Sequence, residues 1–314
     1  MALLPTDSIN TIGVIGLGAI GASWSAWFLA RGLRIRGTDS DPARGRATEN
    51  FIRAAWPALT DIGQANGDVA DALKRFSFHE SVDECVAGCD FVQENAPERR
   101  ELKAELLARI DAALPADRVI ASSTSGFGVS ALAAGMTHPG RLVVGHPFNP
   151  PHLIPLVEVV GGGATTPDAI KSALAFYERI GKKPVHVRKE VAGHLANRLQ
   201  AALWREAVHL VAEGAASVAD IDAVIAHGPG LRWAQMGPHL IFHLAGGEGG
   251  MRHFIDHLGP PIQSWWDTLG TPQLTPQTAA ALIEGVNQEI AGRSYADLVQ
   301  ERDAKLIKTL QALA

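Results

Sequence analysis

Short apolar runs alternate with segments of helical periodicity through the first 190 or so residues of the chain. The runs that we expect to form strands are 10–15, 33–38, 90–93, 119–121, 142–145, 156–160 and 184–187. The segments that we expect to form helices are 22–31, 98–113 and 167–180. Regular alternation of strand and helix predicts a mostly parallel sheet with helices on both of its faces.

The hydrophobic pattern changes after Arg188, and from Glu190 onward it is almost wholly helical. Long helical runs occupy 195–213, 218–226 and 276–292, and a glycine cluster at 246–250 predicts a loop. A chain of 314 residues is long enough for two domains. We therefore expect an α/β domain at 1–189, followed by an all-α domain at 190–314.

A glycine motif stands between the first expected strand and the first expected helix. The residues read GxGxxG and are Gly16, Leu17, Gly18, Ala19, Ile20 and Gly21. In this motif the first glycine permits a tight turn, the second lets the backbone approach a pyrophosphate, and the third lets helix and strand pack closely. The N-terminus of the helix then offers free N–H groups to the phosphates. The motif in this context predicts a Rossmann domain.

The acidic residue that should accompany such a motif is Asp39, at the end of the second expected strand. A carboxylate at this place accepts hydrogen bonds from the adenosine ribose hydroxyls and repels a 2′-phosphate. The expected cofactor is therefore NAD. Arg44 and Arg46 lie nearby and leave NADP as the alternative.

Three polar stretches, IASSTSG at 120–126, GHPFNP at 145–150 and PLVEVV at 155–160, lie at or within expected strands. Ligands of open α/β sheets bind outside the carboxyl ends of the strands, which places His146 well. Glu158 lies in an apolar strand, where a buried carboxylate is costly without a partner. The imidazole of His146 is the obvious partner, because the pair would orient the ring and raise its affinity for a proton.

These motifs, with ENAPE at 94–98 and GHLANR at 193–198, resemble the 3-hydroxyacyl-CoA dehydrogenase superfamily over essentially the whole chain. The resemblance implies that His146 is the acid/base and that Glu158 pairs with it. It implies that Ser125 and Asn197 contact the substrate oxygen, although Ser125 alone could equally be a turn or cap residue. Cofactor contacts implied in the same way are Glu94, Arg99 and Asn149. Arg99 departs from the lysine more usual in the long-chain acyl-CoA members.

The expected substrate is a small hydroxy acid rather than an acyl-CoA. Acyl-CoA members carry basic residues after the second strand, whereas 47–72 of this chain holds a single cationic side chain, Arg53. The phosphates of a CoA would find few partners there.

The second expected domain is rich in large aromatic side chains, namely Trp204, Trp233, Phe242, Trp265 and Trp266. The segments 228–250 and 292–303 resemble the branch of the family that oxidises carnitine, although sugar-acid dehydrogenases share the second segment. Carnitine carries a trimethylammonium group, and tryptophan faces attract such cations. We expect Trp233 to contact the ammonium and Arg232 or another basic residue to hold the carboxylate. Core and dimer packing is the alternative for each tryptophan.

Three other functions fit the same motifs. An L-gulonate 3-dehydrogenase of the lambda-crystallin type and a short-chain 3-hydroxybutyryl-CoA dehydrogenase are the alternative enzymes. A non-enzymatic, crystallin-like protein that keeps the fold and NAD is an alternative of a different class. The complete set of Ser125, His146, Glu158 and Asn197 argues against it.

Composition narrows the partners further. A net charge of −5 and a pI near 6.2 provide no basic surface for nucleic acid. No apolar run reaches the roughly 20 residues that span a bilayer, and the first ten residues do not resemble a secretory signal. With only two cysteines, Cys85 and Cys89, we expect a cytoplasmic protein.

No metal site is expected. The cysteine pair lacks a second pair, and the histidine pairs His239/His243 and His253/His257 lack a third ligand. Because helical second domains in the family usually pair with each other, we expect a homodimer.

Overall fold

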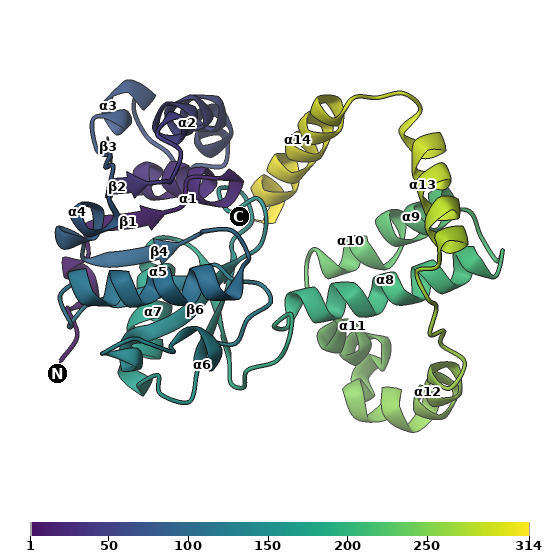
Figure 1. Cartoon of the computed structure of the whole chain (residues 1–314). Coiled ribbons are helices and arrows are strands. Elements are labelled where there is room, and N and C mark those ends of the chain that lie inside the picture. Colours follow the sequence, from purple (N-terminus) through teal and green to yellow (C-terminus); the bar gives the residue numbers. More distant parts are fainter. Residues whose placement is uncertain (1, 314) are drawn as a thin grey trace. The chain divides into compact units, whose positions relative to one another are not determined.

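The computed structural model describes residues 2–313 and is shown in Figure 1. The chain divides into two compact units. The first comprises the residues up to Arg198 together with Leu306–Gln311, and the second comprises Leu199–Lys305 together with Ala312 and Leu313. The boundary expected after residue 189 lies shortly before this division.

The first unit is built on one eight-stranded sheet with the strand order β3-β2-β1-β4-β5-β6-β7-β8. The strands are β1 (Thr11–Ile15), β2 (Arg34–Thr38), β3 (Phe76–Phe78), β4 (Phe91–Glu94), β5 (Val119–Ser122), β6 (Leu142–Pro147), β7 (Leu156–Gly161) and β8 (Lys183–Val187). All neighbouring strands are parallel except β6 and β7, which are antiparallel. The expected mostly parallel sheet is confirmed.

Strand β3 was not expected from the sequence. It is the three-residue run FSF, which is too short to show a periodic pattern. It becomes a strand because it pairs in parallel with β2 at the edge of the sheet.

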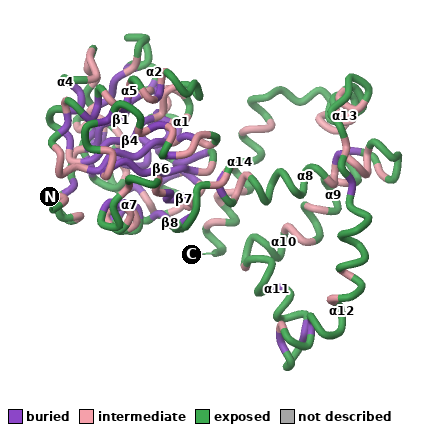
Figure 2. The backbone as a smooth tube through the Cα atoms, turned by 60° about the horizontal axis from the view of Figure 1, so that its bottom comes forward, coloured by how far each residue is buried: buried purple, intermediate pink, exposed green. Residues whose placement is uncertain are grey.

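Helices cover both faces of the sheet, because side chains of successive strand residues point to opposite faces. One face packs against α1 (Ala19–Ala30), α2 (Ala43–Asp61) and α7 (Pro167–Arg179), whose core is rich in aromatic residues. The other face packs against α4 (Val82–Ala87), α5 (Arg100–Ala113) and α6 (Val129–Leu132). Cys85 and Cys89 are both buried on this second face. The short helix α3 (Val69–Leu73) contacts α2. Figure 2 shows the buried backbone concentrated along the strands.

The second unit is helical, as expected. Its helices are α8 (Ala196–Ala212), α9 (Val218–His227), α10 (Pro229–Trp233), α11 (Pro238–Ala245), α12 (Gly250–Trp266), α13 (Pro276–Ile290) and α14 (Tyr295–Leu313), of which α8 and α14 extend into the first unit. The glycine cluster forms a short 3-10 turn, Gly247–Gly249, and then begins α12. Ser217 and Asp220 cap α9 reciprocally, so that this helix begins where its sequence signal lies.

Among residues 2–313 no helix has the combined length and apolar character needed to cross a bilayer. Within the same range, no group of three or more His, Cys, Asp or Glu side chains is arranged to hold a metal ion.

Candidate active site

The glycine motif forms the turn between β1 and α1, and its geometry explains the first and the third glycine. Gly16 has a φ of 86°, and a Cβ there would lie 2.7 Å from the carbonyl oxygen of Asn95. A Cβ on Gly21 would lie 1.9 Å from the carbonyl oxygen of Gly16. Gly18 differs, since a Cβ on it would meet no atom within 4 Å. Gly18 also begins α1 without a capping side chain, so the helix N-terminus is open to a ligand.

This turn lines a cavity of about 690 Å³ together with Asp39. Oδ2 of Asp39 accepts a hydrogen bond from the Leu17 amide at 2.7 Å, and Oδ1 accepts one from the Asp41 amide at 3.0 Å. Ala19 and Ile20 also line the cavity, whereas the Leu17 side chain is buried in the core. Arg44 lines it too, 3.7 Å from Asp41. An uncapped helix N-terminus beside a carboxylate fits the pyrophosphate and ribose of a dinucleotide.

The three other expected cofactor contacts differ in their surroundings. Glu94 is fully buried, and its carboxylate accepts hydrogen bonds from Lys103 Nζ at 2.9 Å and from Ser122 Oγ at 2.5 Å. The Ala96 amide donates to it as well, at 2.6 Å. Glu94 therefore forms a buried, structural ion pair with Lys103, and its side chain is not open to a cofactor. Arg99 and Asn149 are exposed, and their cofactor contacts stay predictions.

His146 and Glu158 face each other across the one antiparallel strand pair. They are direct partners in the register of β6 and β7, and Nδ1 of His146 lies 3.0 Å from Oε2 of Glu158. Both side chains are buried. Because Nδ1 is occupied by the carboxylate, the ring presents Nε2 for chemistry.

The other carboxylate oxygen of Glu158 is held by the backbone at the start of α8. Oε1 accepts hydrogen bonds from the amides of Leu195 at 2.7 Å and Ala196 at 3.0 Å. Burial acts to raise the pKa of Glu158, but the hydrogen bonds from His146 and these two amides outweigh it and hold the pKa below its usual value. The carboxylate is thus ionised and fixes the Nδ1–H tautomer of His146.

Ser125 lies in a loop after β5 that a second carboxylate organises. Oε1 of Glu98 accepts hydrogen bonds from Thr124 Oγ1 at 2.6 Å, from the Gly126 amide at 2.9 Å and from the Ser125 amide at 3.1 Å. Burial acts to raise the pKa of Glu98, and these hydrogen bonds with the nearby Lys103 lower it overall. Sequence reasoning noted Glu98 only as the last letter of ENAPE and missed this role. The position of Glu98 just before α5 was the one feature of the sequence that could have indicated this role.

Asn197 follows Ala196 directly and is the second residue of α8. Asn197 and Ser125 are both half-buried, and neither side chain makes a hydrogen bond to another group within residues 2–313. Both are thereby available to a ligand. Asn197 directly follows the two amides that hold Glu158, and the loop of Ser125 is hydrogen-bonded through the Thr124 carbonyl to His194 of the same segment.

A buried hydrogen-bond network supports β6, and it was not predicted from the sequence. The Tyr177 hydroxyl donates to Gln93 Oε1 at 2.6 Å, and Gln93 Nε2 donates to the carbonyl of Gly145 at 3.1 Å. Gln93 Nε2 also donates to Ser123 Oγ at 2.8 Å. Gly145 must be glycine, because a Cβ there would lie 2.0 Å from the Tyr177 hydroxyl oxygen. The network fixes the backbone immediately before His146.

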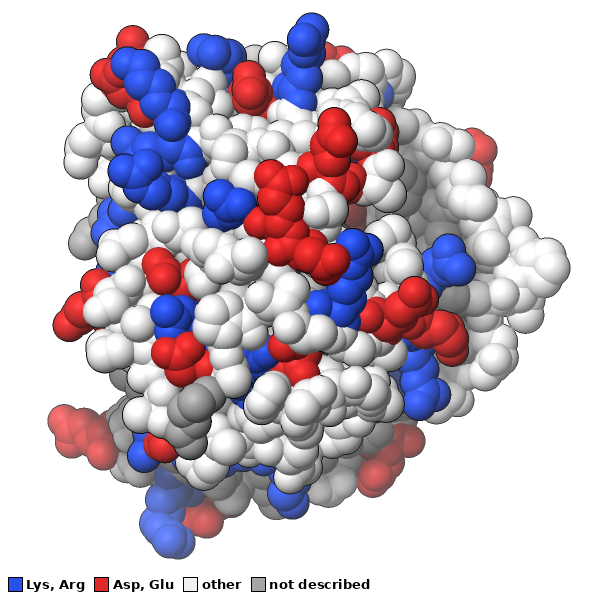
Figure 3. Space-filling model, turned by 60° about the vertical axis from the view of Figure 1, so that its left-hand side comes forward, with Lys and Arg blue, Asp and Glu red and all other residues white. Residues whose placement is uncertain are grey.

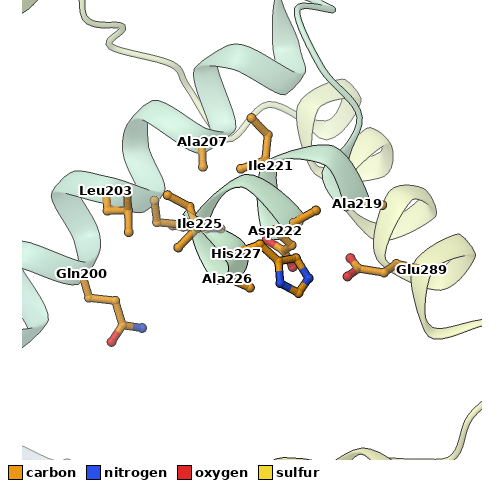
Figure 4. Close-up of a pocket in the computed structure, with 12 residues that line it drawn as sticks. Gln200, Leu203, Ala207, Ala219, Ile221, Asp222, Ile225, Ala226, His227 and Glu289 are labelled. Atoms are coloured by element: carbon orange, nitrogen blue, oxygen red, sulfur yellow. The ribbon is translucent and has the colours of Figure 1, made fainter. Parts of the chain in front are cut away.

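Arg232 and Trp233 lie in α10 of the second unit, and both are exposed. Their contact with substrate stays a prediction. Another tryptophan of the same unit, Trp204, lines a groove of about 580 Å³ formed by α8, α9 and α13. Figure 4 shows that Glu289 of α13 points toward His227 of α9 in this groove.

Charge is distributed without a single dominant sign on the face seen in Figure 3. Acidic and basic side chains are interspersed there, and no continuous basic surface runs across that face. This agrees with the net charge of −5.

A dinucleotide-binding turn and a buried His–Glu pair on one mostly parallel sheet are features of an NAD-dependent dehydrogenase, and comparison with known proteins gives its family. The model of the 3-hydroxyacyl-CoA dehydrogenase NAD-binding domain matches residues 11–191, and that of the C-terminal domain matches residues 193–279. The chain belongs to the 3-hydroxyacyl-CoA dehydrogenase family. Its cofactor is NAD.

Among curated relatives, the chain is similar to an L-carnitine dehydrogenase of Streptomyces griseus, with 51% identity over 98% of this chain and 90% of the relative. An L-carnitine dehydrogenase of Pseudomonas sp. is 46% identical over 97% of this chain and 94% of the relative. One of Bacillus cereus is 43% identical over 98% of this chain and 93% of the relative.

Solved structures of the same fold are also similar. A 5-formyl-3-hydroxy-2-methylpyridine 4-carboxylic acid 5-dehydrogenase, described as an NAD⁺-dependent dismutase, has a TM-score of 0.82 at 28% identity and covers 97% of this chain and 98% of its own. An (S)-3-hydroxybutyryl-CoA dehydrogenase from Ralstonia eutropha has a TM-score of 0.65 at 27% identity and covers 76% of this chain and 83% of its own.

Proposed function

We propose that the protein oxidises the 3-hydroxyl of L-carnitine to 3-dehydrocarnitine with NAD. The observation that carries the proposal is the similarity, over nearly the full length of both chains, to relatives named L-carnitine dehydrogenase. The single cationic side chain in 47–72 also supports it, because the phosphates of an acyl-CoA would lack partners there.

In this proposal four side chains of the first unit perform the chemistry. Bound NAD supplies the hydride acceptor, held at the turn 16–21 and at Asp39. His146 Nε2 removes the proton from the 3-hydroxyl, and the ionised Glu158 stabilises the imidazolium that results. Ser125 and Asn197 donate hydrogen bonds to the substrate oxygen, each worth about 2–4 kcal/mol if well placed.

The trimethylammonium group and the carboxylate of carnitine need an aromatic face and a cationic partner, respectively. Trp233 and Arg232 are our candidates, since an aromatic face attracts a quaternary cation and a guanidinium binds a carboxylate. Replacement of Trp233 by Leu should raise the KM for carnitine about 10-fold or more, with little change in the KM for NAD. Replacement of the exposed Trp266 by Leu is the matched control.

The test follows NADH absorbance with L-carnitine, L-gulonate and 3-hydroxybutyryl-CoA in parallel. We expect carnitine to have the highest kcat/KM. Turnover of either other substrate with no signal from carnitine would reject the proposal and favour the corresponding alternative enzyme. No turnover with any of them would favour the non-enzymatic alternative.

Two carnitine analogues separate the contributions of charge and of the hydroxyl. The neutral tert-butyl analogue, 3-hydroxy-5,5-dimethylhexanoate, keeps the shape of carnitine without the cation and should lose most of the kcat/KM. The analogue without the hydroxyl, 4-(trimethylammonio)butanoate, should inhibit competitively against carnitine. Equal turnover of carnitine and its neutral analogue would contradict recognition of the ammonium.

We also propose a cytoplasmic homodimer. All but three of the exposed large apolar side chains in residues 2–313 lie between Leu199 and Tyr295, an unusual concentration for a surface left in water. A second copy packed against the second unit would cover them. Sedimentation or light scattering should give twice the mass of the 33.3 kDa chain, and a monomer at micromolar concentration would reject this part.

A further inference from the structure

His194 lies in the turn between β8 and α8, and no role has yet been assigned to it. It is only 2% exposed and has a φ of 48°, directly after Gly193 with a φ of 73°. A positive φ is uncommon for a residue with a side chain. It persists here because the surrounding contacts hold it.

The ring of His194 makes one hydrogen bond, to the loop that carries Ser125. Nε2 lies 3.0 Å from the carbonyl oxygen of Thr124. A carbonyl can only accept, so the hydrogen is on Nε2. Nδ1 is buried and has no hydrogen-bond partner within residues 2–313. Burial lowers the pKa of His194, which keeps the ring neutral with Nδ1 bare.

The same ring packs against His146. The two ring centroids are 5.1 Å apart, with the planes tilted by 51°. The charged groups that act on His194 are His146, Glu158 and Glu98. His194 also lines a cavity of about 330 Å³, together with Glu190. A smaller side chain at position 194 would therefore enlarge this cavity.

The backbone of His194 acts on Glu158. Its left-handed conformation turns the chain so that the next two amides, of Leu195 and Ala196, both donate to Oε1 of Glu158. Consecutive amides arranged in this way form a concave site for an anion. One residue thus contacts three parts of the site, namely the Ser125 loop, the His146 ring and the amides that hold Glu158.

We propose that His194 is a positioning residue that sets the orientation of His146 toward Glu158, an inference that rests on the proposed role of His146 as the base. A neutral ring beside His146 leaves the imidazolium formed during oxidation without a like charge at close range. The hydrogen bond from His194 Nε2–H to the Thr124 carbonyl keeps the Ser125 loop and the His194 ring in a fixed relative position. Loss of the ring or of its donor should therefore change how His146 titrates, as well as how fast the enzyme turns over.

The experiment compares His194→Phe, which keeps a flat ring without a donor, with His194→Gln, which keeps an N–H able to reach the Thr124 carbonyl. For His194→Phe we expect kcat to fall about 10- to 100-fold with an unchanged dissociation constant for NAD, because small displacements of a catalytic group cost that much. The lower limb of the pH profile of kcat/KM should shift, and His194→Gln should recover part of the loss. The matched control is the same pair of changes at the exposed His186 of β8.

Imidazole NMR of His146 in the full-length protein gives a readout that does not need turnover. We expect its titration midpoint to move in His194→Phe and to stay in place in His186→Phe. An unchanged midpoint, kcat and pH profile in His194→Phe would overturn the proposal. If His194→Phe does not fold, His194→Leu, which also lacks the donor to Thr124, takes its place, and wild-type values of all three would equally overturn the proposal. A wild-type protein that oxidises no hydroxy acid would refute the proposed function, while the NMR titration would still test His194.

Discussion

His146 and Glu158 are paired residue for residue across β6 and β7, and their side chains lie on the same face of the sheet with Nδ1 3.0 Å from Oε2. This pairing exists because β7 runs antiparallel to β6 in an otherwise parallel sheet. A parallel β7 would have required a long crossover and a different register. The antiparallel direction of β7 thus places the Glu158 carboxylate within hydrogen-bond distance of the His146 imidazole.

Replacement of His146 by Ala should reduce kcat at least 100-fold, because the general base is removed. The dissociation constant for NAD should change little, since His146 lies outside the cavity at the glycine turn. Steady-state kinetics and a fluorescence titration with NADH measure the two quantities. Near-normal turnover would exclude His146 as the base, and His186→Ala is the control for loss of a histidine.

Replacement of Glu158 by Gln should lower kcat by roughly 100-fold or more while the fold persists. The amide oxygen can still accept from Leu195 and Ala196, but the amide NH₂ then faces Nδ1 of His146. His146 must respond by carrying its hydrogen on Nε2, which is the wrong tautomer for a base. A variant with wild-type kcat at pH 7 would show that the carboxylate charge is dispensable.

Ser125→Ala and Asn197→Ala should each lower kcat about 10- to 1,000-fold, which corresponds to one lost donor to a developing oxyanion. Neither change should affect NAD binding or the melting temperature strongly, because neither side chain makes a hydrogen bond within residues 2–313. The double variant tests whether both contact the same oxygen. Independent, multiplicative losses would argue against a shared contact.

Replacement of Asp39 by Ala should weaken NAD binding about 10-fold or more. It should also reduce the preference for NAD over NADP. The carboxylate would no longer bind the ribose, repel a 2′-phosphate or hold the Leu17 amide. The preference is read from kcat/KM with each cofactor. Asp41→Ala, in the same cavity, is the control, and an equal effect of both changes would contradict a specific role for Asp39.

Stability should fall steeply as the pH is lowered below about 4.5. The pKa values of Glu158, Glu98 and Asp111 are all held below their usual values in the folded protein. The unfolded chain therefore binds protons more strongly, so the stabilisation is complete above the unfolded pKa values and is lost as the pH falls through the folded ones. Melting temperatures measured from pH 7 to pH 3 test this. Glu98→Gln should flatten the acid limb, and a variant with the same acid limb as the wild type would remove Glu98 from the explanation.

The alternation of apolar runs was enough to predict seven of the eight strands, since each buried strand needs an apolar stretch that sequence displays directly. The edge strand β3 was not predicted, because it is a strand through its pairing with β2 and not through its own hydrophobic pattern. Several helices near the sheet, among them α4 and α6, are too short for a periodic signal. The Gln93–Tyr177 contact had no local signature because it joins residues 84 positions apart.

The sequence by itself determined the glycine turn and its partner Asp39, because the positive φ of Gly16, the close approach of Gly21 to Gly16 and the spacing to the next strand are local properties. It also predicted the His146–Glu158 pair, since an isolated carboxylate in an apolar strand demands a partner. Only the tertiary structure decided that Glu94 is bound internally by Lys103 and that Glu98 organises the Ser125 loop. It alone brought His194 against His146. Each of these contacts joins residues on different elements of the fold. The physical reason for them is burial, because a buried polar group must find a hydrogen-bond partner among the groups that the fold brings near.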